Sequence, residues 1–172
     1  MSSMLLFYSS LKQKNMNIVL TYQDLYATVE RTLSIVGKRS TDDNGNLLFR
    51  DITLGTREVT IIHDYLRQAI IDLTTELSAF ITGGTDANVT FTLTLPTNHN
   101  ANLETFIQDS CAAYCVSWAL YSWFTITAPR IAEKYLEDCR RQLAAVIRLS
   151  NIKQAPSGNT DILTTSTEVV SN

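Results

Sequence analysis

The chain has 172 residues, of which 45% are hydrophobic and 18% charged, and its formal net charge is −3. This length fits one domain with a real core, and the composition is typical of a folded globular protein rather than a disordered one. The small net charge argues against a nucleic-acid role that depends on bulk positive charge. Three cysteines do not make a disulfide framework, which favours a reducing compartment.

The first fifteen residues are expected to form an N-terminal arm, and Met16 is an alternative start because the pattern becomes orderly only there. The opening MSSMLLFYSS lacks the basic region of a signal peptide, and we expect no membrane span. After an apolar lead-in at 16–20, Thr21 suits a helix N-cap, and Gly37 suits the position after the helix end. The apolar side of this helix consists of Leu25, Val29, Leu33 and Val36.

An irregular region is predicted at 38–55, between the first helix and the second. Its centre, DDNGN at 42–46, is a strong turn signal because Asn-Gly tolerates positive φ, so a β-hairpin or a long ordered loop is expected. The same letters superficially resemble a calcium loop. The ligand spacing and the closing Glu of an EF-hand are absent, so calcium is not favoured.

The stretch 56–81 is predicted to be one long helix around which the other elements are organised. Its apolar residues recur at steps of three and four, as on one helix face. They are Val59, Ile62, Leu66, Ile70, Leu73, Leu77 and Phe80. Four more apolar residues widen this face, so we expect helices to pack on more than one side of it. Gly83 and Gly84 are expected to end it.

The segment VTFTLTLP predicts a half-buried strand, because Val89, Phe91 and Leu93 alternate with threonines before Pro96 closes it. Such a strand can pair within the chain or with a neighbouring subunit. Since few other strands are expected, these three residues are candidate contacts between subunits.

A third helix is predicted at 103–124, capped by Asn102, and it is apolar nearly all round. Such a helix is buried on all sides, either by a compact fold or by another chain. If another chain buries the helix, the candidate interface residues are Trp118, Tyr121, Trp123 and Phe124. A platform for stacking bases is the alternative, but no basic residues are interleaved with these aromatic residues.

A fourth helix begins with Pro129 at its first position and is followed by a tail at 154–172. The inward residues of the helix are expected to be Ile131, Tyr135, Cys139, Leu143, Val146 and Leu149. The tail is rich in Ser, Thr and Asn, but it contains four apolar residues that can pair as a strand with a partner. These candidate partner-binding residues are Ile162, Leu163, Val169 and Val170.

No catalytic constellation is evident in the sequence, so no enzyme activity, metal or cofactor is expected. His63 and the three cysteines, Cys111, Cys115 and Cys139, have the residue types of a four-ligand zinc site. The CxxC spacing of such sites is absent, and free cysteines often serve as small buried hydrophobes. His99 falls in a polar turn and has no partner of metal-ligand spacing.

These elements predict a mainly α fold, a bundle of about four helices with a small β-hairpin or strand insertion and extended terminal arms. The helical domain is expected at 16–153, with the β insertion at 38–55 and 88–96. The remaining segments, 1–15 and 154–172, are the expected arm and tail.

The segment AEKYLEDCRRQLAAVIRLSN (132–151) resembles the helix near the C-terminus of small head–tail connector (neck or adaptor) proteins of tailed bacteriophages. The helices at 21–39 and 56–80 together resemble the helical opening of such proteins, and the resemblance spans 17–153. The chain departs from the family in its long N-terminal arm and its Trp-rich third helix.

The resemblance implies a structural virion protein of the neck or tail, made in the bacterial host cytoplasm, that assembles as a homo-oligomeric ring. Its terminal segments would reach neighbouring subunits, the portal or other neck and tail proteins. DNA in the lumen would be contacted through its backbone without sequence readout. Two other hypotheses stay open: a cytosolic helical adaptor or regulator that binds a partner through an apolar helix surface, and a small metal-dependent enzyme using Cys111, Cys115 and His63.

Overall fold

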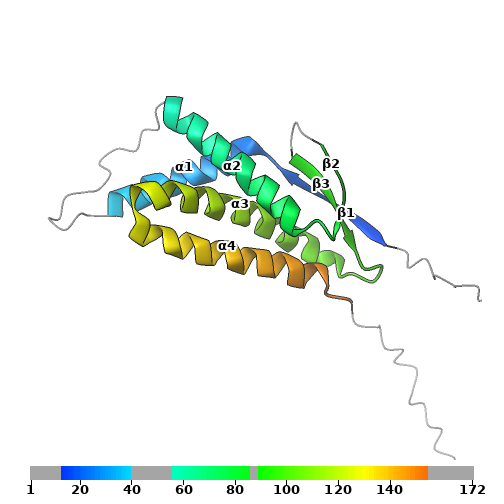
Figure 1. Cartoon of the computed structure of the whole chain (residues 1–172). Coiled ribbons are helices and arrows are strands. Elements are labelled where there is room, and N and C mark those ends of the chain that lie inside the picture. Colours follow the sequence, from blue (N-terminus) through cyan, green and yellow to red (C-terminus); the bar gives the residue numbers. More distant parts are fainter. Residues whose placement is uncertain (1–12, 40–55, 86–88, 155–172) are drawn as a thin grey trace, which may run out of the picture.

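The computed structural model describes residues 13–39, 56–85 and 89–154. The elements in chain order are β1 (Lys14–Leu20), α1 (Tyr22–Arg39), α2 (Thr56–Glu76), β2 (Ile81–Thr85), β3 (Val89–Leu95), the short 3₁₀ turn η1 (Ala101–Leu103), α3 (Glu104–Thr127) and α4 (Pro129–Ser150). The predicted mainly α bundle of four helices with a small β element is confirmed (Figure 1). The predicted hairpin around 42–46 and most of both terminal arms lie outside the described residues.

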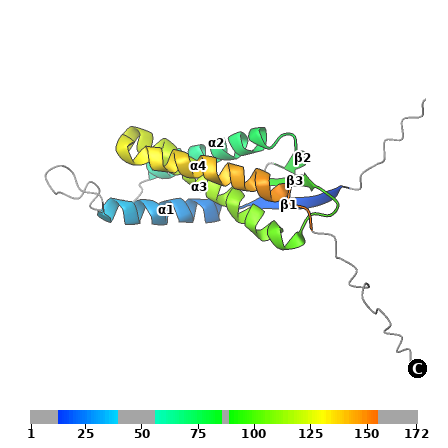
Figure 2. The same cartoon turned by 90° about the horizontal axis from the view of Figure 1, so that it is seen from below.

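Helix α3 occupies the centre of the bundle. It contacts α1, α2, α4 and strand β1 (Figures 1 and 2). These neighbouring elements explain why α3 is apolar nearly all round. They favour burial of α3 within a compact fold over burial by another chain. The prediction that the helix at 56–81 is the organising element is wrong, because α2 lies on one side of α3.

The sheet has the order β1-β3-β2, and both pairings are antiparallel. Strand β3 is therefore paired on both edges within the chain, as in Ile18 opposite Phe91 and Ile81 opposite Leu93. The predicted strand at 89–95 is confirmed. The apolar lead-in at 16–20 is a strand that the sequence reading missed, and Lys14 already belongs to it.

One face of the sheet is buried and the other is polar. The buried side chains are Met16, Ile18 and Leu20 of β1 and Phe91, Leu93 and Leu95 of β3. On the opposite face Thr92 Oγ1 donates to Asn17 Oδ1 at 3.0 Å across the two strands. The alternation of apolar residues and threonines thus has the expected period of two.

Helix α2 ends at Glu76, five residues before the predicted end. A tight turn follows, in which Phe80 N donates to Leu77 O at 2.8 Å. Phe80 O then accepts from Thr94 N at 2.7 Å, so β3 draws this segment into the sheet. Gly83 lies within β2 opposite Thr92 and does not end the helix. The helical periodicity at 77–80 was overridden by strand pairing.

The ends of the other helices agree with the sequence more closely. Thr21 O accepts from Asp24 N and Leu25 N, both at 3.1 Å, at the start of α1, and Pro129 begins α4. Helix α1 continues to Arg39 instead of ending at Gly37. Asn100, not Asn102, is the cap of this region: its side chain accepts from Asn102 N at 3.1 Å and starts η1.

The outer edge of β1 is covered by side chains from the start of α3. Val19 N donates to Gln108 Oε1 at 3.2 Å, and Gln108 Nε2 donates back to Val19 O. The amide side chain thereby imitates the backbone of a neighbouring strand. Lys14 Nζ pairs with Glu104 along the same edge. The two Gln108 contacts occupy the backbone N–H and C=O of Val19, which an edge strand would otherwise offer to another chain.

Replacing Phe124 by Ala should lower the free energy of unfolding by about 3–5 kcal/mol, because the change leaves a cavity beside a fully buried ring. Phe124 stacks on Tyr135 with ring centroids 5.4 Å apart, which joins α3 to α4. Urea unfolding at matched protein concentration measures the loss. Thr125→Ala, on the exposed side of the same turn, is the control and should stay within about 0.5 kcal/mol. Equal losses for both variants would contradict the central position of α3.

Replacing Gln108 by Met should cost about 1–2 kcal/mol, because it removes both hydrogen bonds to Val19 while keeping an unbranched side chain of similar length. Amide exchange of Val19 should accelerate at the same time. Gln68→Met on α2, which loses one exposed bond to Asp72, is the control and should cost about 0.2–0.5 kcal/mol. Unchanged exchange at Val19 would show that Gln108 does not close this edge.

Candidate interaction surface

The four aromatic residues of α3 that were predicted to contact another subunit divide into one buried residue and three half-buried ones. Phe124 is 0% exposed, so the prediction that it forms a contact between subunits is wrong: its ring is used inside the chain. Trp118, Tyr121 and Trp123 are half-buried and pack against the core with part of their surface open. The Trp123 indole N–H is buried and has no hydrogen-bond partner within the described part of the chain.

The predicted contact residues of β3 do not lie at an open edge. Phe91 and Leu93 are buried under the sheet, because β1 pairs with β3 and completes an apolar face over the helices. The prediction that these two side chains contact a second subunit is therefore wrong. Val89 pairs with Leu20 in the register of β1, and its side chain is outside the description. The tail residues Ile162, Leu163, Val169 and Val170 also lie outside the described residues and stay predictions.

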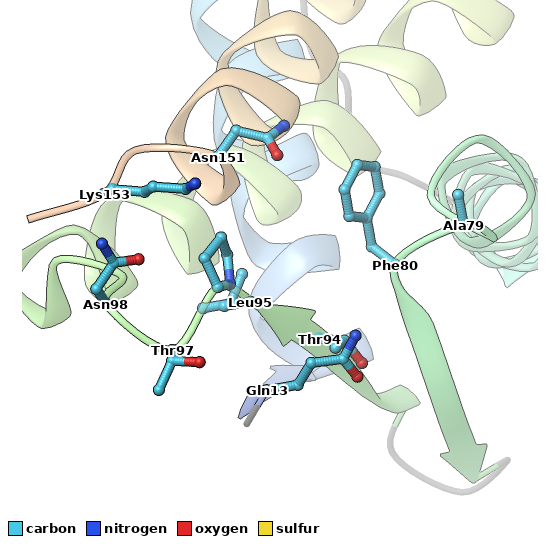
Figure 3. Close-up of a pocket in the computed structure, with 10 residues that line it drawn as sticks. Gln13, Ala79, Phe80, Thr94, Leu95, Thr97, Asn98, Asn151 and Lys153 are labelled. Carbon is cyan, nitrogen blue, oxygen red and sulfur yellow. The ribbon is translucent and has the colours of Figure 1, made fainter. Parts of the chain in front are cut away.

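A groove of about 470 Å³ lies at the end of the molecule where the sheet meets the last turn of α4 (Figure 3). We call it the sheet-end groove. Its lining residues are Gln13, Ala79, Phe80, Thr94, Leu95, Pro96, Thr97, Asn98, Asn151 and Lys153. Gln13 and Lys153 stand beside the two ends of the described chain, so both terminal segments leave the domain next to this groove.

One wall of the sheet-end groove results from the way β2 joins β3. The pairing begins where Phe80 O accepts from Thr94 N, at 2.7 Å. Beyond that point, no strand of the described residues pairs with Leu95 or Pro96 on that side. Phe80 and Pro96 supply apolar surface, and Thr94 Oγ1 is buried without a partner in the described ranges.

The opposite wall is held by His99, whose role the sequence did not reveal. The His99 ring is buried, and its Nε2 lies 3.0 Å from Leu149 O at the end of α4. A carbonyl oxygen only accepts, so Nε2 carries the proton in this contact. Gln154 N donates to Asn98 O at 2.6 Å, and residues His99 and Lys153 form a β-bridge. The chain leaving α4 is thus tied to the loop after β3. A histidine in a polar turn has no sequence signal that would predict this burial.

The chemistry of the sheet-end groove suits the binding of an extended polypeptide. Its side chains provide amide donors and acceptors from Gln13, Asn98 and Asn151, one cation from Lys153, and an apolar patch around Phe80. Among the lining residues that the structure describes there is no carboxylate, and no nucleophile is paired with a base, as nucleophilic catalysis requires.

The cysteines form part of the core between α3 and α4. Cys111, Cys115 and Cys139 are buried free thiols, and burial raises the pKa of Cys111 and of Cys139 to about 12. His63 is exposed on α2, where its ring stacks on Tyr26 with centroids 5.2 Å apart. Across the described ranges, no group of three or more His, Cys, Asp or Glu residues is placed to hold a metal ion. The zinc arrangement considered from the sequence is therefore not assembled.

Across residues 13–39, 56–85 and 89–154, the helices lack the combination of length and apolar character that crossing a membrane requires. The chain matches no protein-family model, no curated protein and no solved structure. Its function is therefore inferred from its own surface and from the resemblance of its helical pattern.

The three thiols should not react with an aromatic disulfide reagent at pH 8 in the native protein, and all three should react in guanidinium chloride. Burial disfavours the thiolate, which is the reactive form. Absorbance of the released thiol counts the reacting groups. Fast reaction of even one equivalent in the native protein would contradict the buried arrangement.

The same pKa shifts give stability a pH dependence. The unfolded chain ionises its thiols above about pH 8.5, while the folded chain keeps them protonated. The contribution of the thiols to the free energy of unfolding is therefore constant below that pH. The free energy of unfolding falls as the pH rises above it. Cys139→Ala removes one thiol and should flatten the fall, whatever its effect on stability at pH 7.

Proposed function

We propose that this protein is a non-catalytic, ring-forming structural subunit of the head–tail connector, or of another neck or tail component, of a tailed bacteriophage. In this role copies of the chain assemble around the DNA passage, and their terminal segments contact neighbouring copies, the portal or other neck proteins. The resemblance of the segments at 21–39, 56–80 and 132–151 to such proteins supports the assignment.

The observation that carries the proposal is the position of the sheet-end groove. Gln13 and Lys153 both line it, so the N-terminal and C-terminal segments leave the domain beside a surface that suits an extended chain. The tail at 155–172 has two acidic residues, Asp161 and Glu168, and no Lys or Arg. Its charge is complementary to that of Lys153, the one charged side chain among the described residues that line the groove.

The cover over α3 favours this role over a single-partner adaptor. The adaptor hypothesis relied on a continuous open apolar face of α3, but α1, α2, α4 and β1 pack against that helix and leave separate exposed side chains. What stays accessible is a set of separate apolar side chains on different elements, among them Ile35 on α1, Ile71 on α2 and Ile126 on α3. Neighbours on more than one side of the subunit would bury such separated surfaces.

The mass of the native particle, measured by light scattering on a size-exclusion column, tests the proposal. The full chain should form a particle many times its monomer mass of 19.3 kDa. A chain ending at Gln154 should form a smaller or weaker oligomer, because it lacks the tail. Negative-stain microscopy should show annular particles for the full chain.

A full-length variant tests whether the apolar residues of the tail, rather than the length of the tail, stabilise the oligomer. In it Ile162, Leu163, Val169 and Val170 are replaced by Ser. This variant should weaken the oligomer as much as truncation does. A 19.3 kDa monomer for the full chain at all accessible concentrations would contradict self-assembly as the function.

A further inference from the structure

A second groove lies between the N-terminal half of α3 and the C-terminal half of α4, with a volume of about 410 Å³. We call it the Phe106 groove. Its apolar lining includes Leu103, Phe106, Ala113 and Leu149, and Phe106 is 59% exposed. Asp109 on α3 and Arg148 on α4 add one charge of each sign. A concave surface that contains so exposed a phenylalanine beside small residues can be filled by a side chain of a partner.

The most exposed large apolar side chain of the described residues, Ile126, lies at the other end of α3. It is 75% exposed, in the last turn before the connection to α4. Twenty residues separate it from Phe106, which corresponds to about 30 Å along the helix axis and about 160° around it. The two apolar sites therefore point in nearly opposite directions. They cannot meet within one chain, but each can meet the other on a second copy.

The charges around the two sites are complementary. The first turns of α4, next to Ile126, expose Arg130 and Glu133. These match Asp109 and Arg148 of the Phe106 groove in opposite sign. The salt bridges recorded for the described residues join Lys14 to Glu104 and Asp138 to Arg141, so all four of these charges are available to a partner.

We propose that Ile126 of one copy docks into the Phe106 groove of the next copy, with Arg130 facing Asp109 and Glu133 facing Arg148. This inference rests on the proposed ring function and names the surfaces that make the ring. The two surfaces differ, so the contact is head-to-tail. Repetition of such a contact closes a ring when the rotation per subunit divides a full turn.

Two single variants of the full chain, Ile126→Asp and Phe106→Asp, test the contact. Both positions are exposed, so circular dichroism should show unchanged helical content. Each variant alone should run as a 19.3 kDa monomer, because every junction lacks one half. An equimolar mixture should form a 1:1 dimer of about twice that mass. In the mixture, Ile126 of the Phe106→Asp chain meets the intact groove of the Ile126→Asp chain, and the outer ends are blocked.

Charge reversal provides a second test that leaves the apolar residues unchanged. Asp109→Arg alone and Arg130→Asp alone should each weaken the oligomer at least tenfold in dissociation constant, and the double variant should restore most of the loss. Arg67→Asp, a charge reversal at an exposed position of α2 that lines neither groove, is the control and should assemble like the native chain.

The outcomes separate this inference from the proposed function. If the native chain forms a ring and both Asp variants form it too, the Ile126 contact is wrong and the ring function stands. If both variants are monomers but their mixture does not dimerise, the head-to-tail arrangement is wrong. If the native chain is itself a monomer at all concentrations, both proposals fail together.

Discussion

Burial of α3 is the constraint on which the rest of the structure depends. A helix with apolar residues on every side needs cover on every side, because exposed apolar surface costs roughly 25 cal/mol per Å². Helices α1, α2 and α4 and strand β1 provide it. The amphipathic faces of the outer helices follow from this arrangement, since each has one side toward α3 and one toward water. The connection through Ala128 then places α4 antiparallel to α3, and the Phe124–Tyr135 stack holds the two together.

The sheet is the second structural unit, and its position decides where the proposed interaction surface lies. Strand β3 is paired on both edges, and Gln108 closes the outer edge of β1. The backbone groups of Val19 are therefore not open to another strand on that side. His99 and Asn98 attach the chain after α4 to the far end of β3. Both ends of the described chain consequently emerge beside one groove, which is the reason to look for partners there.

Most of the elements were predictable because each depends on local periodicity. The faces of α1 and α4, the alternation in β3 and the Pro129 helix start were all evident in the sequence. The candidate site was predicted less well. The sequence makes Phe91 and Leu93 candidates because few partner strands are expected, and Phe124 because its helix is apolar nearly all round. Neither pattern distinguishes a core residue from an interface residue. The burial of His99 and the role of Gln108 depend on contacts between residues 50 and 89 positions apart.

The sequence by itself determined the fold class, the four helices and the central strand, because helix and strand periodicity are properties of neighbouring residues. The tertiary structure alone decided which helix is central, where α2 ends and that residues 16–20 form a strand. Those outcomes depend on contacts between segments far apart in the sequence. Thr94 N donates a hydrogen bond to Phe80 O and so joins Phe80 to the sheet, and β3 pairs with β1. The tertiary structure likewise decided that Phe106 and Ile126, which point in nearly opposite directions, are both exposed. The local pattern of apolar residues shows which side chains can be buried. The packing of the whole chain decides which of them are buried.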